Sequence, residues 1–359
     1  MWKTVVFRLF MKERFVKMLK LRLLLRRIRS FSFGRMLVYV REVKKETKMP
    51  SFLIVLDMLL CIVLYNVGFF DYHIFGFVHI RRHRDRRTFF TMRDNWRLCR
   101  LVNAPKDAEI FQDKIRFCNT FSQFLGREYL DLHHADDKAL DAFLHRHPVV
   151  FLKAPGGFGG LEVERFDAGG TSEKSPSARA LYNDCIGRGF YLVEEGLAQH
   201  KEMCAVYPGS INTVRIVTLT DEKGEPHPLY AFLRTGRGGA CVDNTTSGGL
   251  SALICADGVI RRPALSDKTG EYFDAHPDTG HSFIGFRIPY YNEAVRLCKR
   301  AAQVRPGMRY VGWDVAITPN GPVLVEGNDL PAYDGQIYHQ QEHPGRGLKP
   351  AIQAIVPQL

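Results

Sequence analysis

One segment, YVGWDVAITPNGPVLVEGN at residues 310–328, most constrains what this chain can fold into. Two runs rich in β-branched and aromatic residues flank a Pro-Asn-Gly turn signal. Such a pattern predicts a β-hairpin. The chain has 359 residues, 45% of them hydrophobic and 25% charged, so it has room for a large core and for two or three subdomains.

The loop of this hairpin decides whether its acidic side chains meet. Glu326 and Asn328 share one face, because side chains alternate along a strand. A two-residue Asn320-Gly321 loop would set Val315 opposite Glu326. A three-residue loop, or a bulge, would set Asp314 there instead. Two facing carboxylates repel each other unless a cation lies between them, and with an amide oxygen they suit Mg²⁺. The alternative is a solvated hairpin with scattered polar residues.

A glycine-rich loop, APGGFGG at residues 154–160, separates two further predicted strands. It lacks Gly-Lys-Ser/Thr and precedes a strand, so it is not a Walker P-loop. A turn of this kind can fold over phosphates and donate backbone N–H groups, and Lys153 at its base is placed to pair with a phosphate. The alternative is a flexible hairpin turn. The glycines assigned to the phosphates are Gly156, Gly157, Gly159 and Gly160.

Two strand ends carry further candidate site residues. The segment Glu194-Glu195-Gly196-Leu197 ends an apolar strand, where extended backbone can contact an adenine edge; many such ends are simply exposed. Asn212-Thr213-Val214-Arg215 begins a strong strand. Arg215 lies on it opposite apolar neighbours, and a buried arginine needs an anionic partner such as a carboxylate or phosphoryl group.

Two polar loops are candidates for substrate contact. One runs from Asp243 and Asn244 to Gly248 and Gly249. The other, His276-Pro277-Asp278-Thr279-Gly280, contains a histidine and an aspartate able to transfer protons. A proline-stiffened turn is the alternative for this second loop.

The positive charge is concentrated at the start of the chain. Residues 1–48 hold fifteen Lys or Arg against three Glu, an excess equal to the whole net charge of +12. This arm predicts a basic amphipathic helix that either lies on an anionic membrane or packs on its own domain. Cations throughout the arm argue against a cleavable signal peptide. A formally neutral body argues against nucleic-acid binding.

Two later segments each allow two interpretations. Residues 51–70, SFLIVLDMLLCIVLYNVGFF, approach the length of a membrane span, but Asp57 and Asn66 favour a buried helix. Residues 81–100 are rich in arginine and predict a charged surface helix or loop in preference to a nucleic-acid patch. The eight scattered cysteines form no Cys-x-x-Cys motif, which predicts free thiols in a reducing cytosol.

Taken in order, these segments resemble the ATP-grasp superfamily, and most closely its sugar-transfer-associated family. The wider likeness rests on Lys114, Lys153 with its glycine loop, Glu194–Leu197, Asn212–Arg215, Asp314, Glu326 and Asn328. The closer likeness adds Asp71-Tyr72, Val242–Asn244, Gly248-Gly249, His276–Gly280 and Gly312–Val315. It covers about residues 50–345 and leaves the arm outside.

The resemblance implies an α+β protein with the ATP-grasp fold, in which a mixed sheet and a small antiparallel lid subdomain clasp ATP behind a helical N-terminal region. We expect a basic helical arm at 1–49 and a mainly helical region at 50–147. The lid subdomain would follow at 148–200, and the core with the metal site at 201–359.

The resemblance also implies roles for individual residues. Lys114 and Lys153 would contact ATP, and Glu194, Glu195 and Leu197 would form the adenine hinge. Glu202 is the candidate for the ribose. Two Mg²⁺ ions would be bound by Asp314, Glu326 and Asn328. The acyl phosphate and the tetrahedral intermediate would be stabilised by Arg215. The substrate would be bound by Asn212, Asp243, Asn244, Gly248, Gly249, His276 and Asp278.

The implied activity is an ATP- and Mg²⁺-dependent carboxylate–amine or carboxylate–thiol ligase of bacterial polysaccharide or cell-envelope biosynthesis. Its substrates would be small carboxylates and amines, including sugar-linked ones. We expect a cytoplasmic protein, with peripheral contact between residues 1–49 and the inner face of the membrane left open. The alternatives are an ATP-grasp kinase and a non-catalytic nucleotide-binding partner of a glycosyltransferase complex.

Overall fold

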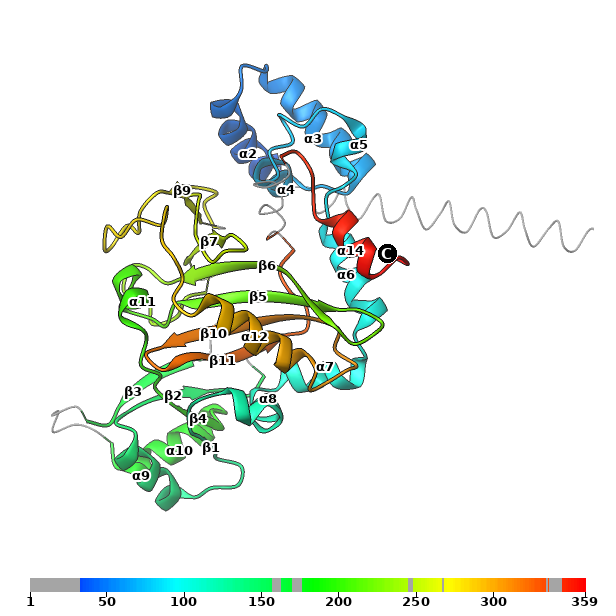
Figure 1. Ribbon diagram of the computed structural model, residues 1–359. Helices are drawn as coiled ribbons and strands as arrows, with labels where there is room; N and C mark the ends of the chain where they lie inside the picture. Colours follow the sequence, from blue (N-terminus) through cyan, green and yellow to red (C-terminus); the bar gives the residue numbers. More distant parts are fainter. Residues whose placement is uncertain are drawn as a thin grey trace, which may run out of the picture. The chain divides into compact units, whose positions relative to one another are not determined.

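The computed structural model describes residues 33–156, 163–169, 176–244, 248–266, 268–333, 335 and 344–359 (Figure 1). The chain divides into two compact units between His73 and Ile74, and each is described by itself. The first 32 residues of the predicted arm lie outside the described ranges, as do Gly157, Gly159 and Gly160 of the glycine loop.

The described part of the first unit is helical. Its helices are α2 (Phe33–Glu46), α3 (Ser51–Tyr65) and the start of α4 (Phe69–Ile74). Pro50 precedes α3, and Asn66 ends it in a left-handed conformation (φ 57°). The small core of this unit is formed by one side of each long helix: Met36, Val40 and Val43 from α2, and Ile54, Met58 and Cys61 from α3.

Helix α3 corrects the prediction of a buried helix at 51–70. Only the side with Ile54, Met58 and Cys61 is buried. The opposite side carries large apolar side chains that are 38–70% exposed. Among the described residues, the long partner helix α2 packs on one side of α3 only. In the described ranges, no single helix is both long enough and apolar enough to cross a membrane. Helices α2 and α3 meet these two criteria only when taken together, as a pair bent by 118°.

The second unit begins with short helices that lead to its smaller sheet. They are α5 (His83–Arg86), α6 (Met92–Val102), α7 (Pro105–Gln112), α8 (Lys114–Phe121) and the 3-10 turn η1 (Ser122–Phe124). Thr91 caps α6 in a reciprocal arrangement with Asp94, and Asp113 caps α8 through the N–H groups of Ile115 and Arg116. The second cap fixes where α8 begins and therefore where Lys114 lies.

The smaller sheet has the strand order β1-β4-β2-β3 among the described residues. Its strands are β1 (Tyr129–Asp131), β2 (Val149–Lys153), β3 (Val163–Asp167) and β4 (Leu192–Glu195), and α9 (Asp137–Arg146) and α10 (Ala178–Arg188) cover one face. β1 comes from the segment expected to be mainly helical. This sheet therefore starts earlier along the chain than residue 148.

The larger sheet has the order β11-β10-β5-β6-β7-β8-β9, and all its described pairings are antiparallel, although we expected a mixed sheet. Successive hairpins link most of its strands, which accounts for this direction. The strands are β5 (Thr213–Thr220), β6 (Pro226–Thr235), β7 (Leu250–Ile254), β8 (Ala264–Leu265), β9 (Tyr272–Phe273), β10 (Tyr310–Thr318) and β11 (Gly321–Asn328). The short helix α11 (Lys201–Val206) precedes β5.

Helices pack on both faces of this sheet, so alternate residues of each strand are buried differently. Helix α12 (Tyr291–Ala302) crosses the face that carries Val214, Ile216 and Trp313 (Figure 1). At one end of the opposite face, α6 and α14 (Lys349–Ile355) pack on Val217 and Tyr310. The other end of that face carries polar side chains and forms part of a cavity.

The hairpin of β10 and β11 brings Asp314 directly opposite Glu326. The loop is a two-residue connection, since Thr318 pairs with Gly321, and Gly321 takes a positive φ of 117°. The register then shifts because Val325 bulges out of the pairing. The predicted facing carboxylates are confirmed, and a bulge produces them in place of a three-residue loop.

Candidate active site

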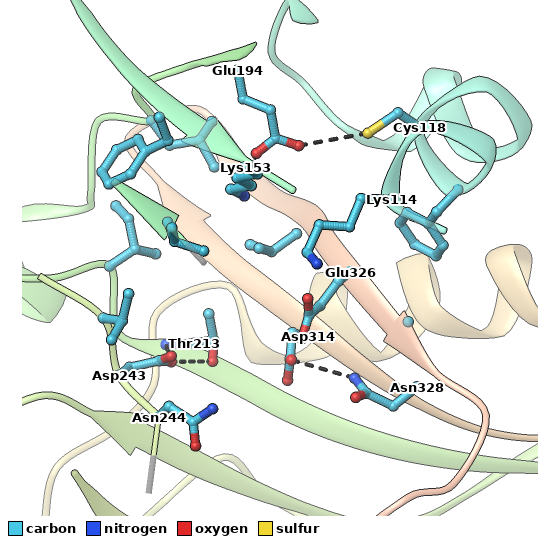
Figure 2. Close-up of a pocket in the computed structure, with 18 of the residues that line it drawn as sticks. Lys114, Cys118, Lys153, Glu194, Thr213, Asp243, Asn244, Asp314, Glu326 and Asn328 are labelled. Atoms are coloured by element: carbon cyan, nitrogen blue, oxygen red, sulfur yellow. Dashed lines mark hydrogen bonds and ion pairs between the residues drawn. The ribbon is translucent and has the colours of Figure 1, made fainter. Parts of the chain in front are cut away.

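A cavity of about 200 Å³ lies between the two sheets of the second unit (Figure 2). Helices α7 and α8 and strands β2 and β4 line one side, and β5, β6, β10 and β11 line the other. The wall combines aromatic and aliphatic side chains with a few converging charges. That mixture is typical of a small-molecule site.

Lys114 reaches the cavity from the first turn of α8. Its backbone N–H donates to the carbonyl of Pro155 (3.0 Å), and its Nζ to the carbonyl of Ala154 (3.2 Å). These bonds tie the start of α8 to the chain that leaves β2. Gly327 lets the same region pack closely, because a Cβ there would meet the rings of Phe111 and Phe117 at 2.7–2.8 Å. The Lys114 amine points toward Glu326 in Figure 2.

Lys153, at the end of β2, makes a buried ion pair with Glu194 of β4. Arg127 holds the same carboxylate at 2.8 Å and is itself 1% exposed. Burial alone would raise the pKa of Glu194, but the charges of Arg127 and Lys153 lower it to about 2. Burial and the charge of Glu194 raise the pKa of the neighbouring Cys118 thiol to about 12.

Two arginines hold Asp314 on the other side of the cavity. Arg215, its neighbour on β5, makes a two-point contact through Nε and Nη2 (2.8 Å for Nη2), and Nη1 of Arg234 on β6 donates at 3.0 Å. Burial alone would raise the pKa of Asp314, but the two guanidinium groups hold it well below its usual range. Asp314 is therefore ionised at neutral pH.

Glu326 differs from its partner, although the same arginines lie near. Burial, followed by the charge of Asp314, raises the pKa of Glu326. The Nδ2 of Asn328 lies 3.5 Å from Oδ2 of Asp314, which brings the amide into the group. Two carboxylates that compete for one proton beside an amide oxygen fit a hard divalent cation such as Mg²⁺. In the described ranges no three His, Cys, Asp or Glu side chains form a metal cluster.

The sequence itself places the chain among known proteins. Residues 93–355 match the family described as sugar-transfer associated ATP-grasp, a match that spans most of the chain. The chain belongs to the sugar-transfer associated ATP-grasp family. A search of curated proteins finds no match.

Several solved structures resemble this ATP-grasp protein only distantly. The N5-carboxyaminoimidazole ribonucleotide synthetase of Thermotoga maritima shares 15% identity over 73% of this chain and 56% of its own, with a TM-score of 0.42. The corresponding synthetase of Staphylococcus aureus shares 11% over 74% and 57% (TM-score 0.45). The D-alanine–D-alanine ligase of Coxiella burnetii shares 11% over 68% and 57% (TM-score 0.39). This chain thus spans little more than half the length of each.

Many of the residues expected from the ATP-grasp pattern meet in the cavity. Those that line it are Lys114, Lys153, Glu194, Glu195, Leu197, Asp243, Asn244, Asp314, Glu326 and Asn328. Arg215 does not line it but contacts Asp314 from behind. Asp243 is held by the N–H of Thr213 (3.0 Å) and lies 3.6 Å from Arg234. The expected site therefore brings together segments more than 200 residues apart.

Other expected site residues lie outside the cavity wall. Glu202 is exposed on α11, and Gly156 is exposed beyond β2. Asn212 is buried and donates to the carbonyls of Met203 and Tyr207 at 2.8 Å. Such contacts give Asn212 a role in the fold.

The 276–280 loop expected to hold substrate packs against the residues that follow β6. His276 is buried against Tyr207, and its Nε2 lies 2.8 Å from the carbonyl of Gly236. Asp278 accepts from the N–H of Gly238 at 2.5 Å. Gly248 has a positive φ of 107°, and Gly249 donates to Asn244 at 3.0 Å. The four residues shape the loops behind the cavity.

Arg234, Arg127 and Cys118 line the cavity wall and were missed by the sequence reasoning. Arg234 lies on an apolar strand, so the argument applied to Arg215 could also have found it. Arg127 follows a glycine in a loop and has no periodic signal. Cys118 is one of several apolar residues on α8, and nothing in the sequence sets it apart.

Proposed function

We propose that this protein is an ATP- and Mg²⁺-dependent ligase that joins a carboxylate to an amine, or to a thiol, through an acyl phosphate. One observation carries the proposal: Asp314 and Glu326 face each other in a cavity that two lysines also line, and the pKa of Glu326 is raised. Two facing carboxylates with lysines nearby suit a cation bound together with nucleotide phosphates.

In the first step, a carboxylate oxygen of the acceptor attacks the γ-phosphorus of ATP, and ADP leaves. Lys153 and Lys114 would provide fixed positive charge beside the phosphates. Asp314, Glu326 and Asn328 would hold two Mg²⁺ ions, which when bound neutralise the transferring phosphoryl oxygens. Lys153 would exchange its contact with Glu194 for one with phosphate, while Arg127 keeps the Glu194 charge balanced.

In the second step, the amine nitrogen attacks the acyl carbon, phosphate leaves and the nitrogen loses a proton. The developing oxyanion needs fixed positive charge nearby. Arg215 would supply it, with Arg234 beside it on the next strand. Both guanidinium groups now contact Asp314, and a cation that takes oxygens of Asp314 would free some of their donors.

The two ends of the cavity would hold different parts of the ligands. Phe151, Val163 and Leu197 give one end an apolar lining that suits an adenine ring. The backbone N–H groups of Glu195 and Gly196 already donate to the carbonyls of Glu128 (3.0 Å) and Val149 (2.9 Å). The backbone of Leu197 would therefore make the hinge contact with the adenine. Asp243 and Asn244 would meet the acceptor at the other end.

The acceptor would be a small carboxylate, including a sugar-linked one, from polysaccharide or cell-envelope biosynthesis. The family description, sugar-transfer associated, supports this substrate class. All eight cysteines, each within the described ranges, are free thiols, which supports a cytoplasmic site of action. The basic charge of residues 1–49 supports peripheral contact with an anionic membrane.

Hydroxylamine tests the proposed intermediate, because it captures an acyl phosphate as a hydroxamate. The protein is incubated with ATP, Mg²⁺ and pools of carboxylates, and both ADP and hydroxamate are measured. We expect carboxylate-dependent ADP release with hydroxamate in equal amount, and loss of both in Asp314→Asn and Glu326→Gln. The control is Glu293→Gln, which removes a carboxylate from the surface pair with Arg296.

Two results would contradict the proposal. Turnover that survives the double substitution would remove the metal assignment. A stable phosphate ester without hydroxamate would instead indicate a kinase-type transfer.

A further inference from the structure

Helix α3 carries a continuous stripe of exposed apolar side chains. The spacing of three and four residues keeps them on one side of the helix. Proteins that stay in water seldom expose so large an apolar patch. The stripe consists of Phe52, Leu53, Leu56, Leu59, Leu60, Val63 and Leu64, with exposures from 38% to 70%.

The stripe has no charge, because the one ionisable carboxylate of α3 is turned toward the protein. Asp57 accepts a hydrogen bond from the buried hydroxyl of Tyr72 at 2.7 Å, and the thiol of Cys61 lies 3.9 Å away. The same inward side carries Ile54 and Met58. The helix is thus apolar on its exposed side, and its one carboxylate is hydrogen-bonded on its inner side.

The length of α3 limits how it can meet a bilayer. Its 15 residues extend about 22 Å, less than the ~30 Å of a hydrocarbon core. A helix of this length with one apolar side can lie in the plane of the interface.

The chain that precedes α3 is rich in cations. Helix α2 and the following turn expose Arg41, Lys44 and Lys48, and residues 1–48 hold fifteen Lys or Arg against three Glu. A second copy of this chain would bring the same positive charges together. Anionic headgroups would instead be attracted to them, at about 1 kcal/mol per residue near the surface.

We propose that α3 is an interfacial helix that inserts its apolar stripe into an anionic phospholipid bilayer. The stripe enters the boundary between headgroups and acyl chains, and the basic residues contact the lipid phosphates. This inference stands apart from the ligase activity, since it rests on residues 1–73 and on none of the residues that line the cavity. It also goes beyond contact through the basic arm, because the apolar stripe supplies insertion.

Vesicle co-sedimentation of the full chain tests the proposal. The vesicles contain phosphatidylcholine with or without phosphatidylserine. The variant Phe52→Ser with Val63→Ser changes two side chains that are 70% and 69% exposed. The matched control is Tyr272→Ser with Ile284→Ser, two exposed apolar residues of the second unit (51% and 46%). Thermal unfolding checks that both variants stay folded.

We expect the wild type and the control to bind vesicles that contain phosphatidylserine, and the α3 variant to bind at least about tenfold less. Equal binding by both variants would overturn the proposal, because basic residues alone would then suffice. A wild-type protein that does not bind the vesicles would overturn the proposal as well. If that wild type is a dimer that the α3 variant dissociates, a second copy covers the stripe.

Discussion

Asp314 and Glu326 face each other across β10 and β11 because Val325 bulges out of the strand pairing. Without the bulge, Glu326 would move along its strand and the carboxylates would separate. The two side chains differ in charge state, since arginines hold the pKa of Asp314 low while that of Glu326 is raised. The same pair should therefore respond differently to neutral substitutions.

We expect Asp314→Asn to destabilise the protein and Glu326→Gln to leave its stability nearly unchanged. The first change leaves Arg215 and Arg234 buried without their carboxylate, which costs about 3–5 kcal/mol. The second change removes the repulsion between the carboxylates of Glu326 and Asp314 in the cation-free protein. Urea unfolding measures both, and calorimetric titration should show that Mg²⁺ binding with nucleotide is lost in both. Equal destabilisation by the two would contradict the charge assignment.

The affinity for Mg²⁺ should rise with pH. In the cation-free protein, the raised pKa keeps a proton on Glu326 to higher pH than on an ordinary glutamate. The cation binds the ionised carboxylate, so binding releases this proton until the pH exceeds the raised pKa. Titration in buffers of different ionisation enthalpy measures the released protons. Glu326→Gln should abolish the release, and an unchanged release in that variant would assign it elsewhere.

Glu194 should contribute stability that depends on pH. Its folded-state pKa is lowered from 4.5 to about 2, so its contribution is complete above the unfolded pKa and disappears as the pH falls toward 2. At neutral pH the shift corresponds to about 3 kcal/mol. Glu194→Gln should lower the free energy of unfolding by that order at neutral pH and by much less in acid. A loss that does not depend on pH would indicate a packing effect instead.

Two cysteines of the cavity wall should react differently with iodoacetamide. Cys118 is buried with a pKa raised to about 12, whereas Cys241 is exposed. Because the thiolate is the reactive form, Cys241 should be alkylated first at mildly alkaline pH. ATP with Mg²⁺ should slow that reaction, and peptide mass spectrometry follows each site. Equal protection of the half-buried Cys204, which does not line the cavity, would point to a global change.

Arg127 should matter for metal binding although it is not in the predicted metal set. Its guanidinium donates to the carbonyls of Leu324 (2.6 Å) and Val325 (3.1 Å), at the bulge that orients Glu326. Arg127→Met should therefore weaken Mg²⁺ binding measured with a paramagnetic Mn²⁺ substitute. Arg116→Met, which breaks an exposed pair with Glu109, is the control. Metal affinity that stays at the wild-type value would show that β11 keeps the bulge unaided.

Local sequence patterns predicted the central strands because their signals are short-range. The bounds of β2, β5 and β10 agree with the alternation of apolar residues and the turn residues around them. Exposure could not be predicted in the same way. Residues 51–65 form a helix as the composition suggests, but which sides are buried depends on how little chain packs against them.

The candidate site was predicted best where one residue's chemistry demanded a partner. Facing carboxylates and an arginine on an apolar strand led to Asp314, Glu326 and Arg215. Residues chosen for loop composition, such as His276 and Asn212, instead stabilise the loops themselves. Composition does not show whether a polar side chain turns toward a cavity or toward its own backbone.

Arg127 also connects the two charged groups of the cavity. It holds Glu194, the partner of Lys153, and it holds the backbone beside Glu326. If a phosphate draws Lys153 away from Glu194, the charge balance around Arg127 changes, and with it the support of the bulge. Nucleotide and cation would then favour one another beyond their direct contact, and by thermodynamic reciprocity each would raise the other's affinity by the same factor.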